Sequence, residues 1–307
     1  MDAIRAANLT RRFGDHAAVD QLTLSVQQGE IFGLVGPDGA GKTTTMRLLT
    51  AILAPSEGDA WVEGLHIVKD ADPIKDCIGY MSQRFGLYPD LTVLENIDFY
   101  ADLYGVSRKG RSERVDELLA FSNLTPFKRR AAGNLSGGMK QKLGLACALV
   151  HTPRVLFLDE PTNGVDPVSR RDFWRILYQL LQEQVTIFVS TSYLDEAERC
   201  GRIGLMHQGH LLACDTVAGV KQLMKGTLLE LRCPSTRRVC ALLREAQVGS
   251  VALFGDRLHV LVEDADRGRR TVEAILSAAA IPCLELSVTE PSLEDVFMSA
   301  LPEEIDR

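Results

Sequence analysis

The stretch Gly36-Pro37-Asp38-Gly39-Ala40-Gly41-Lys42-Thr43 decides the fold of this chain, because it matches the phosphate-loop pattern G-x-x-x-x-G-K-[ST]. An apolar run, Ile31–Val35, comes directly before it, and a segment with Met46, Leu49 and Leu53 on one helical face follows it. The glycines allow backbone N–H groups to turn inward, and the helix adds the positive end of its dipole. A strand, a glycine loop and a helix in this order predict a site for nucleotide phosphates.

Two side chains of the loop have predicted roles of their own. Lys42 neutralises the β- and γ-phosphates, and the Thr43 hydroxyl ligates Mg²⁺. A glycine turn formed by chance is the competing interpretation, and the flanking strand and helix argue against it. Together with Thr44, which follows directly, the predicted ATP contacts are Gly36, Pro37, Asp38, Gly39, Ala40, Gly41, Lys42, Thr43 and Thr44.

A second apolar run, residues 155–158, ends in the two acids Asp159 and Glu160. A core strand normally ends in turn residues, whereas adjacent carboxylates at its carboxyl end suit a metal site. Asp159 is expected to hold Mg²⁺ directly or through water. Glu160 is placed to orient and polarise an attacking water, because phosphoryl transfer depends mainly on positioning and charge stabilisation. The acids and the loop together predict a site that hydrolyses Mg-ATP.

Short apolar runs alternate with helical patterns through residues 1–215, as is typical of a mostly parallel α/β sheet. The runs at residues 31–35, 155–158 and 186–189 are nearly all apolar, as expected for strands covered on both faces. Residues 87–134 predict a helical subdomain, in which Thr92 and Glu95 form a capping box. Two amphipathic helices are predicted from the apolar faces Met139, Leu143, Ala146, Cys147 and Val150, and Phe173, Ile176, Leu177, Leu180 and Leu181.

The pattern changes after Gly226, and a second domain is expected. Strands are predicted at residues 228–232, 251–254, 258–262 and 283–288, and helices at residues 236–246, 270–279 and 291–301. This order, β-α-β-β-α-β with a terminal helix, suggests a small ferredoxin-like module. The predicted domains are an ATP-binding domain at residues 1–217 and an accessory or regulatory domain at residues 218–307.

The bulk composition narrows the class of protein. The chain has 307 residues and a formal charge of −7, which argues against a nucleic-acid binder, since such proteins usually carry a basic excess. Its seven cysteines are odd in number and form no CxxC pair, so reduced thiols of the cytosol fit better than disulfides or zinc. Neither a signal peptide nor a run of about 20 apolar residues is visible, so any action on a membrane is expected to be peripheral.

The segment Leu135-Ser136-Gly137-Gly138-Met139-Lys140-Gln141 narrows the choice among phosphate-loop proteins. Read from its residues, it is a helix start with Ser136 as N-cap, and a plain cap would not need two glycines, which cost helix stability. The chain resembles the ATP-binding cassette family, whose signature is similar to LSGGQ, over roughly residues 3–215. The resemblance implies that Ser136, Gly137 and Gly138 contact the γ-phosphate held by a second cassette, and hence a homodimer or a heterodimer.

Three more positions match motifs of that family. Phe13 is similar to the aromatic residue that stacks on adenine, and its alternative is a core or edge aromatic. Gln83 resembles the Q-loop glutamine, which implies contact with Mg²⁺ and with the helical subdomain, and its alternative is an exposed loop glutamine. Asp166 matches the D-loop, which implies a place at the dimer interface, and its alternative is a common turn that starts a helix.

One position departs from the family. A histidine that contacts the γ-phosphate usually follows the strand after the D-loop, and Ser192 occupies that place. Serine donates a hydrogen bond but is shorter and carries no imidazolium charge. One hypothesis is that the site binds ATP and hydrolyses it slowly, or relies on an intact partner site. The other is that Glu160 suffices and that Ser192 has little cost.

The tail Pro291-Ser-Leu-Glu-Asp-Val-Phe297, Asp38 and the run that follows Ser192 are similar to type-2 exporters, especially the YbhF-like multidrug-efflux group. That resemblance implies an ATPase at the cytoplasmic face of the plasma membrane, acting on separate transmembrane permease subunits. Residues Phe85, Leu87, Tyr88 and Leu91 offer apolar area for a permease segment, or they only pack the helical subdomain. Two rival classes stay open: a soluble cassette ATPase acting on DNA or ribosomes, and an ATP-gated scaffold with weak hydrolysis.

Overall fold

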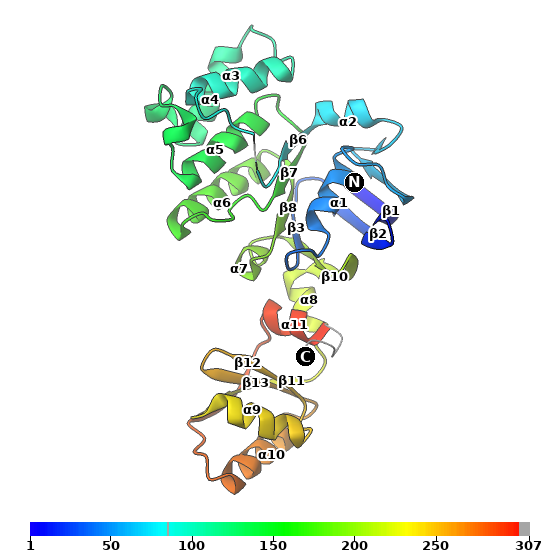
Figure 1. Ribbon diagram of the computed structural model, residues 1–307, viewed down its shortest axis with the longest axis vertical. Helices are drawn as coiled ribbons and strands as arrows, with labels where there is room; N and C mark the ends of the chain where they lie inside the picture. The colour runs from blue at the N-terminus through cyan, green and yellow to red at the C-terminus, as the bar shows by residue number, and fades with distance from the viewer. Residues whose placement is uncertain (85, 301–307) are drawn as a thin grey trace. The chain divides into compact units, whose positions relative to one another are not determined.

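The computed structural model describes residues 1–84 and 86–300 of the chain. Its residue contacts separate two units, Met1–Cys214 and Asp215–Arg307 (Figure 1). The division falls inside a strand, three residues before the boundary expected from the sequence. In the part of the chain that the structure describes, no helix combines the length and the apolar character needed to cross a bilayer.

A six-stranded sheet forms the centre of the first unit, with the strand order β10-β9-β3-β8-β7-β6. Strand β3 pairs in parallel with β9 and β8, and β7 pairs in parallel with β8 and β6. All residues of β3, β7 and β8 are buried, which confirms the three strands predicted as covered on both faces. The strands are β3 (Ile31–Val35), β6 (Ile78–Met81), β7 (Val155–Asp159), β8 (Thr186–Thr191), β9 (Arg202–His207) and β10 (His210–Thr216).

Helices lie on both sides of this sheet. In Figure 1, α1 (Lys42–Leu49) lies on one side of β7 and β8, and α5 (Gly137–Ala148) and α6 (Pro167–Gln182) lie on the other. A short helix, α2 (Ala71–Cys77), leads into β6, and α7 (Leu194–Ala197) follows β8. The prediction of an amphipathic α5 was wrong in one respect: both Leu145 and Lys142 are buried, since α3 and α6 pack around this helix.

A second sheet was not predicted from the sequence. Four antiparallel strands follow the order β2-β1-β4-β5, with β1 (Asp2–Phe13), β2 (His16–Gln27), β4 (Glu57–Val62) and β5 (Leu65–His66). The expectation of a mostly parallel sheet over residues 1–215 therefore holds for the six-stranded sheet and fails for these strands. A tight turn at Gly14, whose φ is +59°, joins β1 to β2 and makes the antiparallel pairing possible.

The helical subdomain contains α3 (Val93–Leu103), α4 (Arg111–Phe121) and short 3-10 turns at Thr125–Phe127 and Ala132–Asn134. The predicted capping box is confirmed: the Thr92 hydroxyl accepts from the Glu95 N–H, and the Glu95 carboxylate accepts from the Thr92 N–H. Phe85, which the sequence placed near this subdomain, lies outside the described residues.

The second unit contains one antiparallel sheet of order β12-β13-β11-β14. Buried apolar residues such as Leu229, Val260 and Val272 join its strands to two helices. The predicted element order is observed, whereas membership of the ferredoxin-like folds stays a prediction; one helix starts at Ala265 instead of 270, because Asp264 caps it. The elements are α8 (Val217–Gln222), β11 (Thr227–Arg232), α9 (Thr236–Glu245), β12 (Ser250–Phe254), β13 (Arg257–Val262), α10 (Ala265–Ala278), β14 (Glu285–Thr289) and α11 (Leu293–Ala300).

Candidate nucleotide site

The predicted site residues lie at or directly after the carboxyl ends of four neighbouring strands. The phosphate loop follows β3, Ser192 follows β8, the two acids close β7, and Gln83 follows β6. In a parallel sheet these ends meet at one edge, which is where open α/β sheets bind their ligands. The strand order β3-β8-β7-β6 therefore brings distant segments of the sequence to one place.

The phosphate loop needs glycine at two positions for steric reasons. A Cβ atom on Gly36 would lie 2.1 Å from the backbone oxygen of Met206, and one on Gly41 would lie 2.2 Å from that of Ala18. Gly41 also has a φ of +104°, in the region that favours glycine. The loop is thus packed against β2 and β9, and α1 begins directly after it at Lys42.

Lys42 forms a buried ion pair with Glu160. Its Nζ atom lies 3.1 Å from Glu160 Oε1, and the two side chains are 4% and 8% exposed. Lys42 Nζ also donates to the backbone oxygens of Gly36 at 2.8 Å and Pro37 at 3.0 Å. The Lys42 ammonium is therefore bound to the backbone of its own loop, and the Glu160 carboxylate is its counter-charge.

Asp159 keeps one carboxylate oxygen without a partner. Its Oδ1 atom accepts from Ser190 Oγ at 2.6 Å and from Thr43 Oγ1 at 3.1 Å. Its Oδ2 atom is buried and finds no hydrogen-bond donor among the described residues. Burial raises the pKa of this carboxyl group above its ordinary value, while the bonds from Ser190 and Thr43 oppose that change. A carboxylate oxygen free beside a threonine hydroxyl fits a hard divalent cation such as Mg²⁺.

Glu160 is held through its second oxygen. Its Oε2 atom accepts from Gln83 Nε2 at 2.8 Å and from Asn163 Nδ2 at 3.2 Å. The residue has a φ of +48°, a strained value for a residue with a side chain, and its N–H donates to Ser190 Oγ at 3.0 Å. Gln83 is an exposed residue, as the alternative interpretation expected, and its amide nevertheless contacts the Glu160 carboxylate.

Phe13 stands at the surface next to an arginine. Its side chain is 50% exposed, so it is not a core aromatic. The Arg11 guanidinium lies 4.7 Å from the ring centroid, and Arg11 also donates to the backbone oxygen of Ala54 at 3.0 Å. One face of the ring is thus covered by a fixed cation, and the ring is available to a planar base.

The signature segment packs against α6. Ser136 is the N-cap of α5 as predicted, and its hydroxyl accepts from the Met139 N–H at 3.3 Å. A Cβ atom on Gly138 would meet Ser169 Cβ at 2.4 Å, whereas one on Gly137 would meet nothing closer than 3.9 Å. Gly138 therefore allows close packing of the two helices, and Gly137 leaves backbone open to another molecule.

Asp166 caps the other helix of this contact. Its carboxylate accepts from the N–H groups of Ser169 at 3.0 Å and Val168 at 3.1 Å. Hydrogen bonds from the side chain and backbone of Ser169 hold the pKa of Asp166 below its ordinary value. The turn and helix start that the sequence offered as an alternative are present, and they leave Asp166 exposed at the surface.

Ser192 is exposed at the end of β8, and the residues around it form a polar network that the sequence reasoning missed. Glu196, which is 1% exposed, accepts from Thr191 Oγ1 at 2.9 Å and from Thr162 Oγ1, and lies 3.3 Å from Arg170 Nε. Glu196 lies on the short helix α7, and its burial there could have been suspected only from its place between Leu194 and Ala197. The sequence patterns assign no role to Ser190, Asn163 or Tyr193. Their contacts in the structure place them in the site.

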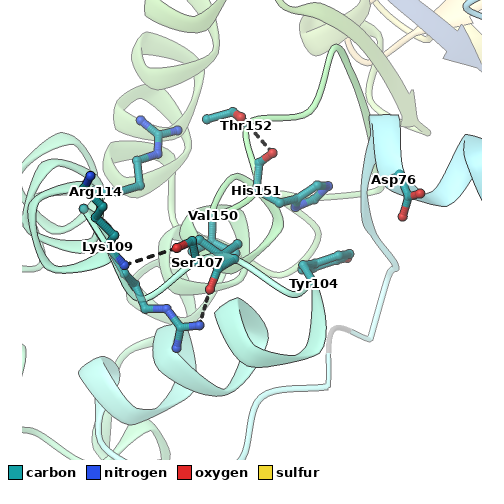
Figure 2. A pocket seen from close by; sticks show the side chains of 11 residues that line it. Asp76, Tyr104, Ser107, Lys109, Arg114, Val150, His151 and Thr152 are labelled. Carbon is teal, nitrogen blue, oxygen red and sulfur yellow. Dashed lines mark hydrogen bonds between the residues drawn. The ribbon is translucent and has the colours of Figure 1, made fainter.

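A cavity of about 480 Å³ lies apart from these residues, where α4 and the segment after α5 approach α2 (Figure 2). Lys109, Arg111 and Arg114 contribute three cationic side chains to its lining. His151 stacks on Tyr104 at 3.9 Å between ring centroids, and its Nε2 atom lies 2.8 Å from the Ile78 backbone oxygen. Burial lowers the pKa of His151 below its ordinary value. Asp76 also lines the cavity, and Arg111 and Arg114 are paired with Asp102 and Glu117.

Comparison with known proteins identifies the class that this fold and site define. The family model described as "ABC transporter" matches residues 19–163. An ATP-binding subunit of an ABC transporter superposes with a TM-score of 0.66 at 26% identity, covering 72% of this chain and 92% of its own. A dimeric post-hydrolysis state of the cassette MJ0796, bound to ADP and Pi, superposes with a TM-score of 0.63 at 26% identity, covering 69% and 98%.

Curated relatives agree along nearly the whole chain. The probable multidrug ABC transporter ATP-binding protein YbhF of Escherichia coli (strain K12) is 42% identical over 98% of this chain and 52% of its own length. The linearmycin resistance ATP-binding protein LnrL of Bacillus subtilis (strain 168) is 32% identical over 96% of this chain and 97% of its own. The chain spans about half the length of its YbhF relatives. It belongs to the ATP-binding cassette family of ABC transporters, the family whose transporter subunits hydrolyse ATP.

Proposed function

We propose that this chain binds Mg-ATP and, paired with a second cassette, hydrolyses it to drive export through a separate transmembrane permease. The observation that carries the proposal is the meeting of Lys42, Asp159, Glu160 and Gln83 at one edge of the six-stranded sheet. A lysine for phosphates, a carboxylate for a cation and a second carboxylate for water are the parts that phosphoryl transfer requires.

The residues of the chain divide the work of the reaction. The loop from Gly36 to Thr44 surrounds the phosphates, and its backbone N–H groups from Asp38 onward donate to them. A phosphate oxygen then replaces Glu160 as the counter-charge of Lys42. Glu160 Oε1, released from Lys42, accepts a hydrogen bond from the attacking water and orients it. Phe13 stacks on the adenine ring through the face that Arg11 leaves free.

Thr43, Asp159 and Gln83 are the proposed holders of Mg²⁺. The unpartnered Oδ2 atom of Asp159 supports this assignment, because a buried carboxylate oxygen needs a donor or a cation. When bound, the cation supplies charge stabilisation for the β- and γ-phosphate oxygens. Ser190 keeps the carboxylate in place through its bond to Oδ1.

The second cassette completes the site in this proposal. Ser136, Gly137 and Gly138 contact the γ-phosphate bound by the other subunit, and Asp166 lies at the shared interface. The open surface beside Gly137 supports this role, as does the dimeric form of the similar cassette MJ0796. Whether the partner is a second copy of this chain or a different cassette decides between a homodimer and a heterodimer.

Export is favoured over the rival classes by the relatives. The similar proteins include a bacitracin transport ATP-binding protein of Bacillus licheniformis, and a Nod factor export ATP-binding protein I of Cupriavidus metallidurans, 38% identical over 68% of this chain. We infer from them a peripheral subunit at the cytoplasmic face of the plasma membrane, which passes a substrate outward. A role on DNA or ribosomes has no support among these proteins or in the net charge of −7.

The permease is proposed to contact the helical subdomain near the Q-loop. Tyr88 and Phe99 are 46% and 37% exposed, and their ring centroids lie 4.6 Å apart. The two rings form an exposed aromatic pair on the helical subdomain. Leu87 and Leu91 are partly buried, in keeping with the alternative that they pack the subdomain. Tyr104, which follows α3, and Lys109 line the cavity of Figure 2, so a permease segment that is apolar and carries an acidic residue suits this surface.

Steady-state ATPase activity of the purified chain tests the proposal, with and without its candidate permease. We expect Lys42→Ala to abolish nucleotide binding and Glu160→Gln to keep binding but lower kcat by about 100-fold or more. Lys75→Ala and Glu113→Gln, exposed on α2 and α4, are the matched controls and should retain full activity. Wild-type protein that binds ATP yet shows no turnover in either state would instead favour the ATP-gated scaffold.

A further inference from the structure

The Asn163 side chain connects the catalytic carboxylate to a tyrosine. Its Nδ2 atom donates to Glu160 Oε2 at 3.2 Å, and its Oδ1 atom accepts from the Tyr193 hydroxyl at 3.4 Å. An amide has one donor end and one acceptor end, so the two contacts select the same orientation of the group. If the amide rotated, its oxygen would face the carboxylate and its NH₂ group would face the hydroxyl.

Besides its hydroxyl bond to Asn163, Tyr193 makes two contacts that fix its position. The Arg170 guanidinium lies 4.5 Å from the ring centroid, and the Tyr193 N–H donates to Thr191 Oγ1 at 3.0 Å. Arg170 is in turn fixed by α7, with Glu196 at 3.3 Å from its Nε atom and Asp195 at 3.6 Å from one terminal nitrogen. The contact with Arg170 therefore fixes the Tyr193 ring so that its hydroxyl reaches Asn163.

Glu196 anchors both ends of this arrangement. Its buried carboxylate accepts from Thr162, the residue before Asn163, and from Thr191, which holds the backbone of Tyr193. The segment after β7 and the segment after β8 are thereby tied to one group. Their spacing sets the distance between Asn163 and Tyr193.

The two oxygens of Glu160 have separate environments. Lys42 holds Oε1, and Gln83 and Asn163 hold Oε2. When Lys42 turns to a phosphate, Oε1 is freed for water, while Oε2 keeps its donors and the carboxylate plane stays fixed.

We propose that Asn163 and Tyr193 are positioning residues, which orient the Glu160 carboxylate through the chain Tyr193 Oη to Asn163 Oδ1 and Asn163 Nδ2 to Glu160 Oε2. This inference rests on the proposed hydrolysis of Mg-ATP. Among the described residues, no hydrogen bond joins either side chain to the loop at residues 36–44, so we expect their effect on turnover and not on nucleotide affinity. Asn163 acts directly on the carboxylate, and Tyr193 acts only through Asn163.

Kinetics of Tyr193→Phe, Asn163→Ala and the double variant test this order of action. We expect kcat to fall about 5-fold for Tyr193→Phe and about 10- to 100-fold for Asn163→Ala, with KM for ATP within about twofold of wild type. The double variant should be no slower than Asn163→Ala alone, because among the described residues the Tyr193 hydroxyl is linked to Glu160 only through Asn163. Tyr178→Phe, which removes a hydroxyl bonded to the Arg199 backbone oxygen at 3.1 Å, is the matched control and should turn over normally.

Independent losses that multiply in the double variant would overturn the relay, as would a Tyr193→Phe variant that turns over like wild type. A readout without turnover separates this result from failure of the proposed function. The sequence contains five asparagines, so the Asn163 side-chain amide can be assigned by NMR of ¹⁵N-asparagine protein with Asn163→Ala as reference. Tyr193→Phe should shift that amide resonance alone. An unmoved resonance would reject the relay, even if the wild-type chain proved unable to hydrolyse ATP.

Discussion

Lys42 Nζ lies 3.1 Å from Glu160 Oε1, and both side chains are buried. Lys42, the proposed partner of the phosphates, and Glu160, the proposed partner of the attacking water, are therefore each other's counter-charge. In the proposed function ATP replaces Glu160 as the counter-charge of Lys42, because the phosphates carry more negative charge than one carboxylate. The same proposed exchange would free Glu160 Oε1 to accept a hydrogen bond from water.

Without nucleotide, Lys42→Met should lower the free energy of unfolding by about 1–3 kcal/mol, because it leaves the buried Glu160 with only its amide donors. The double variant Lys42→Met/Glu160→Gln should recover most of that loss, since no unpaired charge remains. Urea unfolding in nucleotide-free and Mg²⁺-free buffer measures both values. Equal stability of the single and double variants would mean that the ion pair is not formed in solution.

Ser192→His should raise kcat for ATP by severalfold to about tenfold, because an imidazole has the reach and the charge that serine lacks. Ser192→Ala is the companion variant, and it reports any hydrogen bond that the serine itself supplies. Steady-state turnover at saturating Mg-ATP is the measurement. Turnover of Ser192→His equal to that of wild type would show that Glu160 suffices and that the site is not slowed by its serine.

Gly138→Ala should destabilise the first unit by about 1–3 kcal/mol, because the added Cβ would lie 2.4 Å from Ser169 Cβ. Gly137→Ala meets nothing closer than 3.9 Å and should be neutral or slightly stabilising, since alanine favours a helix. Thermal unfolding compares the two variants. Adding Ser169→Gly to Gly138→Ala should restore part of the loss, and an absence of such coupling would reject the steric explanation.

Cys200 should resist alkylation until the chain unfolds. Burial raises the pKa of its thiol to about 12, so the thiolate that alkylation requires is scarce at pH 8 in the native state. Exposed Cys283 is the internal control and should react without unfolding. Because the folded pKa lies above the unfolded value near 8.5, stability should be retained below that value and decline as pH rises toward about 12. Mass spectrometry after iodoacetamide treatment, with and without urea, measures the site.

Asp295→Ala should loosen α11 at the end of the second unit. The Asp295 carboxylate lies 2.6 Å from His259 Nδ1 and accepts from the Ser292 N–H at 2.8 Å, so it both caps the helix and ties it to β13. Hydrogen exchange of the α11 amides should accelerate about 10-fold or more, while the phosphate loop keeps its wild-type rates. Unchanged exchange in α11 would show that Leu293 and Val296, both buried, hold the helix without this carboxylate.

Much of the fold could be predicted because it depends on local patterns. The three buried strands, the capping box at Thr92 and the N-cap at Ser136 follow from runs of apolar residues and from helix-start chemistry. The antiparallel sheet of β1, β2, β4 and β5 could not be, since its pairing joins segments such as Ala6 and Ala60 that are far apart in sequence. Burial of Lys142 in α5 likewise depends on neighbouring helices and not on the helix itself.

The candidate site divides in the same way. Lys42, Thr43, Asp159 and Glu160 were predicted from motifs, because the backbone geometry of a phosphate loop and the end of a buried strand restrict which residues can stand there. Asn163, Tyr193, Ser190 and Glu196 were missed, because amide, hydroxyl and carboxylate groups of loops have many possible partners. Only the tertiary structure shows that these residues contact Glu160, Asp159 and one another.

The sequence by itself determined the class of site, since glycine, lysine and acid at set spacings suffice for a phosphate loop and a metal-binding strand end. The tertiary structure decided which groups meet. Gln83 lies 77 positions before Glu160 and Thr43 lies 116 before Asp159, yet each pair is in hydrogen-bond contact. The physical reason is the parallel order β3-β8-β7-β6, which brings the carboxyl ends of strands distant in the chain to one edge of the sheet.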